Sequence, residues 1–124
     1  MSGPIVYISR WRIKEGVEHE WWSMVERVLP GLEAAKPRTV FQNFYVDESG
    51  NLSILHIFPD AEAMDLHAEG AMGRSQTAYE FIEPIGFEIY GSPTESFLAT
   101  LRDIPNIDSL LQVWPDHRAG FSRF

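Results

Sequence analysis

The most constraining feature of the sequence is a pair of neighbouring stretches whose apolar residues fall on both sides of a β-strand. TVFQNFYV (39–46) and LSILHIF (52–58) are rich in β-branched and aromatic residues, and the turn-forming DESGN (47–51) joins them into a predicted β-hairpin. In the first strand, the apolar residues are Val40, Phe44 and Val46 on one side and Phe41 and Tyr45 on the other. Because neither side is polar, the hairpin needs a layer of protein on both faces.

Two further stretches predict strands, and the segment between the first of them and the hairpin predicts a helix. IVYISRWRI (5–13) and EPIGFEIYG (83–91) are rich in residues that favour strands. Between residues 17 and 32, apolar residues recur in steps of three and four, as on one face of an amphipathic helix. Pro30 lies within this pattern, so we expect it either to kink the helix or to begin a separate short turn.

A second helix is expected after the hairpin, and more structure after the last strand. Asp60 is a good candidate for the N-cap of the second helix, which Gly70 and Gly73 are expected to break or bend. SPTE (92–95) has the form of a capping box with proline at the first helical position. We therefore expect a short helix, one more strand and an aromatic tail at the end of the chain.

The order of these elements predicts an α+β fold. β-α-β-β-α-β is the ferredoxin-like plan, in which two helices cover one face of an antiparallel sheet. We expect residues 1–92 to form this domain, and residues 93–124 to form a C-terminal helix and strand extension that packs on the same domain or on a partner subunit. Since the other face of the sheet is also apolar, we expect a homodimer through the sheet face; the alternative is one subunit covered by its own tail.

Composition excludes several classes of partner and site. Ten basic and 18 acidic residues give a net charge of −8, which disfavours binding to nucleic acid or to an anionic membrane surface. The chain has no cysteine, so disulfides, thiolate nucleophiles and cysteine-based zinc sites are excluded. Neither a signal segment nor a membrane-spanning stretch is apparent, and we expect a cytoplasmic location.

FPDAEAMDLH (58–67), followed by EFIEPIGFEIYG (80–91), resembles the antibiotic biosynthesis monooxygenase family, whose members are dimeric α+β barrels. The resemblance covers roughly residues 4 to 92. Its features are the aromatic residue that ends the third strand, the acidic and alanine-containing start of the second helix, the histidine on that helix and the glutamate in the fourth strand: Phe58, Asp60, Ala63, His67 and Glu88.

The resemblance implies a monooxygenase-like protein that needs no metal or other cofactor. Studied members of the family oxidise phenolic aromatic molecules, whose own carbanion reacts with oxygen, in an apolar pocket between sheet and helices. That pocket uses Trp, Asn, Tyr and Arg side chains, and residues of these types occur here at Trp11, Asn43, Tyr45 and Arg10. The expected ligand is therefore a small aromatic or quinol-type molecule.

Two polar residues are the main catalytic candidates. His67 shares a helical face with Met64 and is expected to point inward, either as a bonded core histidine or as an acid or base in the pocket. Asn43 lies between two aromatic residues and is either a pocket donor or an exposed edge residue. The full expected site consists of His67 and Asn43 as catalytic residues and of Arg10, Tyr45, Phe58, Met64 and Trp22 as substrate-binding residues.

His56 is the other histidine with a defined pattern around it. It shares a strand face with Ile54 and Phe58, which favours packing in the core or at a dimer interface, and it need not meet His67. The two histidines lack the spacing of a metal-binding motif, so we expect no metal.

Two alternative functions stay open. One is a non-catalytic dimeric ligand-binding or stress-associated module on the same fold. The other is haem degradation, since haem-degrading oxygenases share the fold and use a histidine on the helix that carries His67. Those enzymes place it nearer to the position of Gly73 and have a tryptophan near the end of the third strand, and this chain departs from both features.

Overall fold

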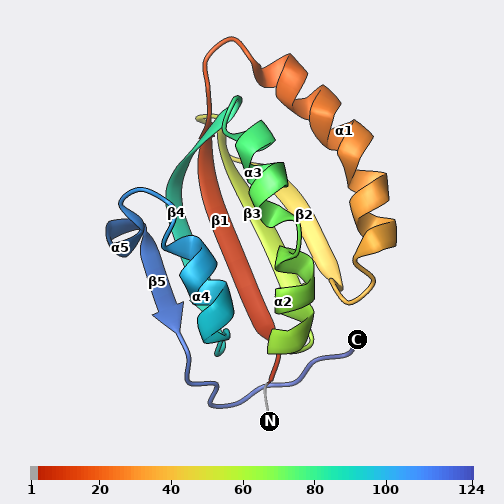
Figure 1. The fold of residues 1–124 in the computed structure, drawn as a ribbon, viewed down its shortest axis with the longest axis vertical. Coiled ribbons are helices and arrows are strands. Elements are labelled where there is room, and N and C mark those ends of the chain that lie inside the picture. The colour runs from red at the N-terminus through yellow and green to blue at the C-terminus, as the bar shows by residue number, and fades with distance from the viewer. Residues whose placement is uncertain (1–2) are drawn as a thin grey trace.

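The computed structural model of the protein describes residues 3–124, without the side chains of Met72 and Ser75. One five-stranded sheet forms its centre, and the helices lie over one face of that sheet (Figure 1). In chain order the elements are β1 (Ile5–Ile13), α1 (Glu18–Ala35), β2 (Phe41–Val46), β3 (Asn51–Phe58), α2 (Ala61–Ala68), α3 (Ala71–Ala78), β4 (Ile82–Tyr90), α4 (Glu95–Leu101), α5 (Ile107–Leu110) and β5 (Leu111–Trp114).

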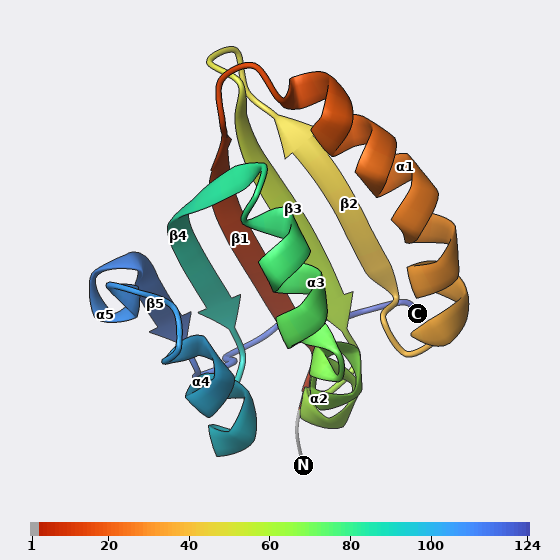
Figure 2. The same cartoon turned by 45° about the horizontal axis from the view of Figure 1, so that its top comes forward.

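The strand order confirms the predicted ferredoxin-like plan. The strands lie side by side in the order β2-β3-β1-β4-β5. β1 pairs antiparallel with β3 and with β4, and β2 and β3 form the expected hairpin. β5 extends the sheet by pairing parallel with β4, so the C-terminal segment joins the same sheet (Figure 2).

The face of the sheet that lies under the helices forms the core. β3 alternates strictly between buried and half-buried residues, and every buried one points toward the helices. The register of β1 against β3 aligns buried and half-buried side chains on this face. The aligned pairs are Ile5 with Phe58, Tyr7 with His56, Ser9 with Ile54 and Trp11 with Leu52.

The opposite face, which we call the open face, is apolar at one end. One row of cross-strand neighbours runs over all five strands there and consists of Phe41, Ile57, Val6, Tyr90 and Trp114. This row confirms that the hairpin is apolar on both sides. The tail that follows β5 crosses beyond the end of the sheet (Figures 1 and 2) and leaves Trp114 57% exposed and Phe121 80% exposed.

Three features of the helices were only partly expected from the sequence. α1 runs unbroken through Pro30, so no separate turn begins there. Pro30 and Glu26, whose carbonyl loses its usual helical donor, are both exposed, so water can bond that carbonyl. Gly70, with a φ of +78°, separates α2 from α3, whereas Gly73 lies inside α3. The prediction of a capping box that begins at Ser92 was wrong, because the N-cap of α4 is Thr94.

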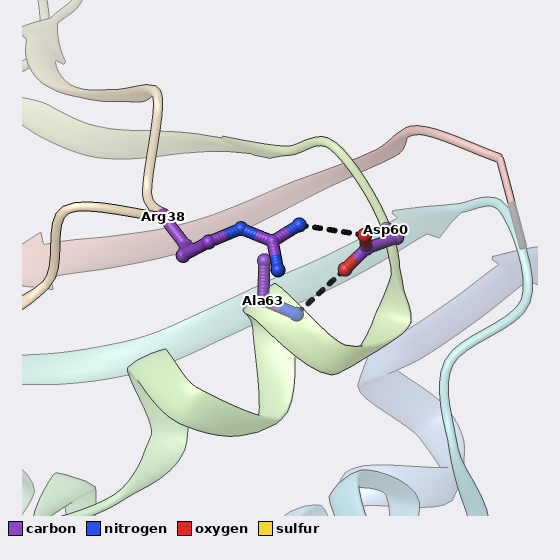
Figure 3. A network of polar contacts seen from close by, with 3 residues as sticks. All are labelled: Arg38, Asp60 and Ala63. Atoms are coloured by element: carbon purple, nitrogen blue, oxygen red, sulfur yellow. Dashed lines mark hydrogen bonds and ion pairs between the residues drawn. The ribbon is translucent and has the colours of Figure 1, made fainter.

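Asp60 joins the start of α2 to the loop before β2. One carboxylate oxygen accepts a hydrogen bond of 2.8 Å from the backbone N–H of Ala63, as predicted for an N-cap, and the other pairs with the Arg38 guanidinium at 2.6 Å (Figure 3). The Ala63 N–H, followed by Arg38, lowers the pKa of Asp60. The loop that carries Arg38 is thus anchored to α2.

We expect Asp60→Ala to lower the urea midpoint of unfolding, because it removes both the cap and the ion pair. Asp60→Asn, which keeps a capping oxygen, should lower it less, and Glu62→Ala, in the same helical turn, should change it least. Since the folded pKa is depressed, the charged form of Asp60 stabilises the fold above the ordinary aspartate pKa, and this contribution is lost as the pH falls below it. Equal midpoints for the Asp60→Ala and Glu62→Ala variants would contradict this role.

Candidate functional site

A pocket of about 470 Å³ lies between the core-facing side of the sheet and the helices, and we call it the sheet–helix pocket. Its floor comes from β1, β2, β3 and β4, and its walls come from α1, α3 and α4. The floor includes Tyr7, Ser9, Trp11, Gln42, Ile54, His56 and Phe87. The walls include Trp21, Leu29, Ala71, Arg74, Phe97 and Leu101, with His67 at the end of α2.

Aromatic rings from distant parts of the chain meet around this pocket. Trp11 on the floor lies 5.8 Å from Tyr79, and Trp21 of α1 lies 6.4 Å from Phe44, both measured between ring centroids. Rings at such separations contact one another through edges and tilted faces. They give the pocket rigid, flat side chains of the kind that bind flat ligands.

His56 and His67 meet at one end of the sheet–helix pocket. Their ring centroids are 5.0 Å apart in an edge-to-face arrangement. His56 is 6% exposed and faces the helices, so the alternative that it marks a sheet-face interface is excluded. His67 points inward, as expected from its helical face. The sequence did not require the two histidines to meet, and they do so because α2 folds back over the strand that carries His56.

Both imidazoles favour their neutral form. Burial, followed by the nearby His67, lowers the pKa of His56 to about 3. Burial, followed by the charges of Arg74 and Lys36, lowers the pKa of His67 to about 4. At neutral pH each ring is therefore uncharged, with one nitrogen that donates a hydrogen bond and one that accepts.

Two contacts hold His67 in place. Its Nδ1 forms a hydrogen bond of 2.7 Å with the hydroxyl of Thr39, just before β2. Arg74 donates from Nη2 to the backbone oxygen of His67 at 2.7 Å and from Nη1 to that of Glu69 at 3.1 Å. Arg74 thereby bonds the last carbonyls of α2 and connects α2 with α3. Because Nδ1 is engaged on the Thr39 side, Nε2 points away from Thr39.

Two buried polar atoms beside the pocket have no partner within residues 3–124. They are Nδ1 of His56 and Nε1 of Trp21, and both residues line the sheet–helix pocket. A buried donor or acceptor without a hydrogen bond costs about 1–3 kcal/mol. Such groups call for a bonding partner that the chain itself does not supply.

The structure brings only part of the expected site to this pocket. His67 lines it, as does Trp11. Phe58 and Met64 are fully buried, and the Phe58 ring packs beneath His67 at 5.3 Å. Trp22 packs against two aromatic rings, with its ring centroid 6.1 Å from that of Trp21 and 6.3 Å from that of Phe44.

Asn43, Arg10 and Tyr45 lie on the open face and do not line the sheet–helix pocket. Asn43 is aligned with Leu55, and Arg10 and Tyr45 are both aligned with Ser53. The reason is the two-residue period of a strand: these positions alternate with those that face the helices. Arg10 forms an ion pair with Glu88, which also accepts a hydrogen bond from the Tyr90 hydroxyl.

Tyr7, Gln42 and Arg74 are among the pocket residues that the sequence analysis did not name. The first two could have been found, because strand periodicity places Tyr7 with Trp11 and places Gln42 with Phe44. Arg74 could not, since its position depends on the turn at Gly70 between two short helices.

Within the described chain, no group of three or more His, Cys, Asp or Glu side chains is placed to hold a metal ion. The search over residues 3–124 finds no helix that is both long and apolar enough to cross a membrane.

Comparison with known proteins identifies the fold. No protein-family model and no curated protein sequence matches the chain. Among solved structures, MupZ from Pseudomonas fluorescens aligns with a TM-score of 0.69 and 16% identity over 98% of this chain and 95% of that chain. This match extends over nearly the whole chain and therefore includes the C-terminal extension.

Two further structures match about three quarters of the chain. SnoaB from Streptomyces nogalater, a cofactor-independent oxygenase, aligns with a TM-score of 0.59 and 11% identity over 74% of this chain and 95% of that chain. A candidate antibiotic biosynthesis monooxygenase from Bacteroides thetaiotaomicron gives a TM-score of 0.57 and 14% identity over 70% and 85%. The chain has the fold of antibiotic biosynthesis monooxygenases, which confirms the resemblance seen in the sequence at the level of fold.

We expect His56 and His67, whose pKa values are both lowered, to make the fold sensitive to mild acid. The unfolded chain, with histidine pKa values of about 6.5, binds more protons than the folded chain at about pH 5, so the free energy of unfolding falls as the pH falls below about 6.5. His56→Leu should flatten this dependence in urea unfolding measured between about pH 7 and pH 4.5. His19→Gln, an exposed histidine of α1, should keep the wild-type slope. Identical slopes in all three proteins would contradict the neutral, buried state of His56.

Proposed function

We propose that the protein is a cofactor-independent, monooxygenase-like enzyme that acts on a small aromatic or quinol-type molecule in the sheet–helix pocket. The observation that carries this proposal is the pair of neutral imidazoles, 5.0 Å apart, at the end of a pocket with aromatic walls. A neutral imidazole has a lone pair that can accept a hydrogen bond, and then a proton, from a bound hydroxyl group. An aromatic pocket binds the flat, apolar body of such a substrate.

The pocket also matches a substrate that carries polar oxygen atoms. The indole N–H of Trp21 can donate to an oxygen of the ligand, and the unpartnered nitrogen of His56 can bond a hydroxyl. A ligand that supplies these partners removes the cost of leaving two polar atoms unbonded. A purely aliphatic molecule would fill the pocket and leave both atoms unsatisfied.

The proposed chemistry begins with a proton transfer to a histidine. His67 lines the pocket with Nδ1 bonded to Thr39, so its Nε2 is the atom that would take the proton of a phenolic or quinol hydroxyl. The electron-rich substrate anion then reduces molecular oxygen. One oxygen atom becomes a carbonyl oxygen on a ring carbon that gives up its single hydrogen, the other leaves as water with that hydrogen and the proton held by the histidine, and the substrate supplies the electrons that reduce the oxygen. The histidine returns its proton as water forms.

The shared fold is consistent with this chemistry without determining it. SnoaB is a cofactor-independent oxygenase and has this fold at 11% identity. Fold alone does not determine function, so the proposal depends on the residues of this chain. The second candidate is a protein that binds the same ligand without turnover. The lowered pKa values of both histidines favour it, because they make each imidazole a weak base.

Oxygen uptake with a panel of quinols and anthrone-type phenols tests the proposal. His67→Gln and His56→Gln should each lower the rate about 100-fold or more, because each removes a group that takes part in proton transfer. His19→Gln, which changes an exposed histidine, is the matched control and should keep the wild-type rate. Ligand binding without oxygen uptake would contradict the monooxygenase proposal and support the non-catalytic alternative.

We also propose that two copies pair through the open face. The row formed by Phe41, Ile57, Val6, Tyr90 and Trp114 is half-buried or exposed in the single chain. Covering such a row removes apolar surface from water at about 25 cal/mol per Å². The Arg10–Glu88 ion pair lies next to this row, and its charges would restrict how two open faces can align.

Analytical ultracentrifugation of the wild-type protein should give the mass of a dimer. Ile57→Lys should shift the population to monomer, because it places a charge in the middle of the apolar row. Leu66→Lys changes a 39% exposed apolar residue of α2, on the other side of the sheet, and should leave the dimer intact. A monomeric wild-type protein, or equal masses for the two variants, would overturn the interface.

A further inference from the structure

Arg74 brings a positive charge to the end of the sheet–helix pocket where the two histidines meet. Among the described residues that line this pocket, Arg74 is the only arginine or lysine, and Asp103 is the only acidic residue. Asp103 is exposed in the turn after α4 and forms no ion pair within residues 3–124. Besides burial, which is the largest cause, the charge of Arg74 lowers the pKa of His56 and of His67, so this charge reaches both imidazoles.

The guanidinium of Arg74 has no acidic partner. Each ion pair in the described part of the chain joins other residues. Arg74 donates only to two backbone oxygens, those of His67 at 2.7 Å and Glu69 at 3.1 Å. Its other N–H groups have no acceptor within residues 3–124, and a guanidinium carries enough of them to bond both oxygens of a carboxylate.

The end of α2 does not neutralise this charge. A second cation already bonds the same end, because Nζ of Lys36 donates to the backbone oxygens of Leu66 at 2.7 Å and Glu69 at 3.1 Å. A helix C-terminus carries only about half an elementary negative charge, whereas Lys36 and Arg74 together carry two positive ones. The exposed carboxylate of Glu69 forms no ion pair with either cation. Positive charge therefore remains at this end of the pocket.

A ligand that fills the pocket increases the need for a counterion. Burial lowers the pKa of Arg74, which shows that its charged form is already partly removed from water. A bound molecule excludes more of that water. If the molecule is neutral, the guanidinium loses hydration and gains no opposite charge, which is unfavourable. If the molecule carries an anion at this end, the ion pair offsets the lost hydration.

We propose that Arg74 binds the carboxylate of an aromatic acid, whose apolar body lies on the floor of the sheet–helix pocket. This inference rests on the proposed function, since it takes this pocket as the ligand site, and it adds that the ligand is an anion. A planar carboxylate matches the fork of donors on a guanidinium and accepts two hydrogen bonds from it. The volume of about 470 Å³ holds a small aromatic acid, and the rings of Tyr7 and Trp11 contact its body.

The bound carboxylate also makes His67 a stronger base. Burial, followed by the charges of Arg74 and Lys36, lowers the pKa of His67 to about 4. Of the groups around this imidazole, Arg74 of α3 and Lys36 after α1 are positive, and His56 of β3 is uncharged at neutral pH. A negative charge beside Arg74 opposes the two cations and raises the pKa of His67. The ligand thus favours the proton transfer that the proposed reaction requires.

Equilibrium dialysis with three naphthalene derivatives tests the inference. They are 2-naphthoate, 2-naphthamide and 2-naphthylmethylammonium, which have similar shapes and are negative, neutral and positive at neutral pH. We expect the wild-type protein to bind 2-naphthoate about tenfold or more tightly than 2-naphthamide, because a hydrogen bond to a charged partner is stronger than one between neutral groups. The ammonium, which Arg74 repels, should bind most weakly.

Matched variants assign the preference to Arg74. Arg74→Gln should bring the affinity ratio of 2-naphthoate to 2-naphthamide close to one, while unchanged binding of 2-naphthamide shows that the pocket is intact. Arg74→Lys keeps the charge without the fork of donors and should retain part of the ratio. Arg27→Gln removes an exposed arginine of α1, changes the net charge equally and should leave the ratio as in the wild type.

Nuclear magnetic resonance of the His67 ring nitrogens gives a second measurement on the wild-type protein. In a pH titration with saturating ligand, the pKa of His67 should be higher with 2-naphthoate than with 2-naphthamide. Equal pKa values in the two complexes would contradict a carboxylate at this end of the pocket. This readout does not depend on how well the Arg74 variants fold.

Three binding results would also overturn the inference. They are equal affinity for 2-naphthoate and 2-naphthamide, equal ratios in the Arg74→Gln and Arg27→Gln variants, and no binding of any probe. None of the probes carries a phenolic hydroxyl, so their binding is measured independently of the proposed oxygenation. A preference for the anion without oxygen uptake from any phenol would retain this ligand class and reject only the chemistry. Oxygen uptake without that preference would reject only the role of Arg74.

Discussion

The register of β1 between β3 and β4 decides which side chains reach the sheet–helix pocket. β1 is the central strand, and its pairing aligns Tyr7 with His56 and Trp11 with Leu52 on the core-facing side. A shift of one residue would move Tyr7 and Trp11 to the open face and bring Arg10 under the helices. Burying an unpaired guanidinium is costly, and Arg10 instead pairs with Glu88 on the open face. The charged residues of β1 therefore help to fix the register on which the pocket depends.

The core that lies on this pairing contains buried polar atoms among its apolar residues. Most residues that face the helices are apolar and stabilise the fold by burial. His56 is 6% exposed and Trp21 is 3% exposed, and each keeps a polar atom that has no partner within residues 3–124. Rings pack around His56 beside the sheet–helix pocket: Tyr7 and Phe58 stack on it, and His67 lies edge-to-face with it. A bound ligand with oxygen atoms would resolve both problems, since it fills the space and bonds the unpaired atoms.

Local periodicity determined how much of this could be predicted from the sequence. The element order, the two-sided hairpin and the Asp60 cap depend on neighbouring residues, and the structure confirms them. The meeting of His56 with His67 depends on how α2 turns back over β3, which no local pattern describes. Asn43 and Tyr45 were placed in the site by residue type, although their strand positions put them on the open face. Arg74 lies beyond a glycine with positive φ and could be found only in three dimensions.

The proposed function requires a ligand that binds between the sheet and the helices, against His56. Intermolecular nuclear Overhauser effects between the ring protons of 1,4-naphthoquinone and the labelled protein test this most directly. We predict contacts to the ring protons of His56, Tyr7 and Trp21, which line the sheet–helix pocket. Contacts confined to Phe41, Ile57 or Trp114 would place the ligand on the open face and contradict the claim.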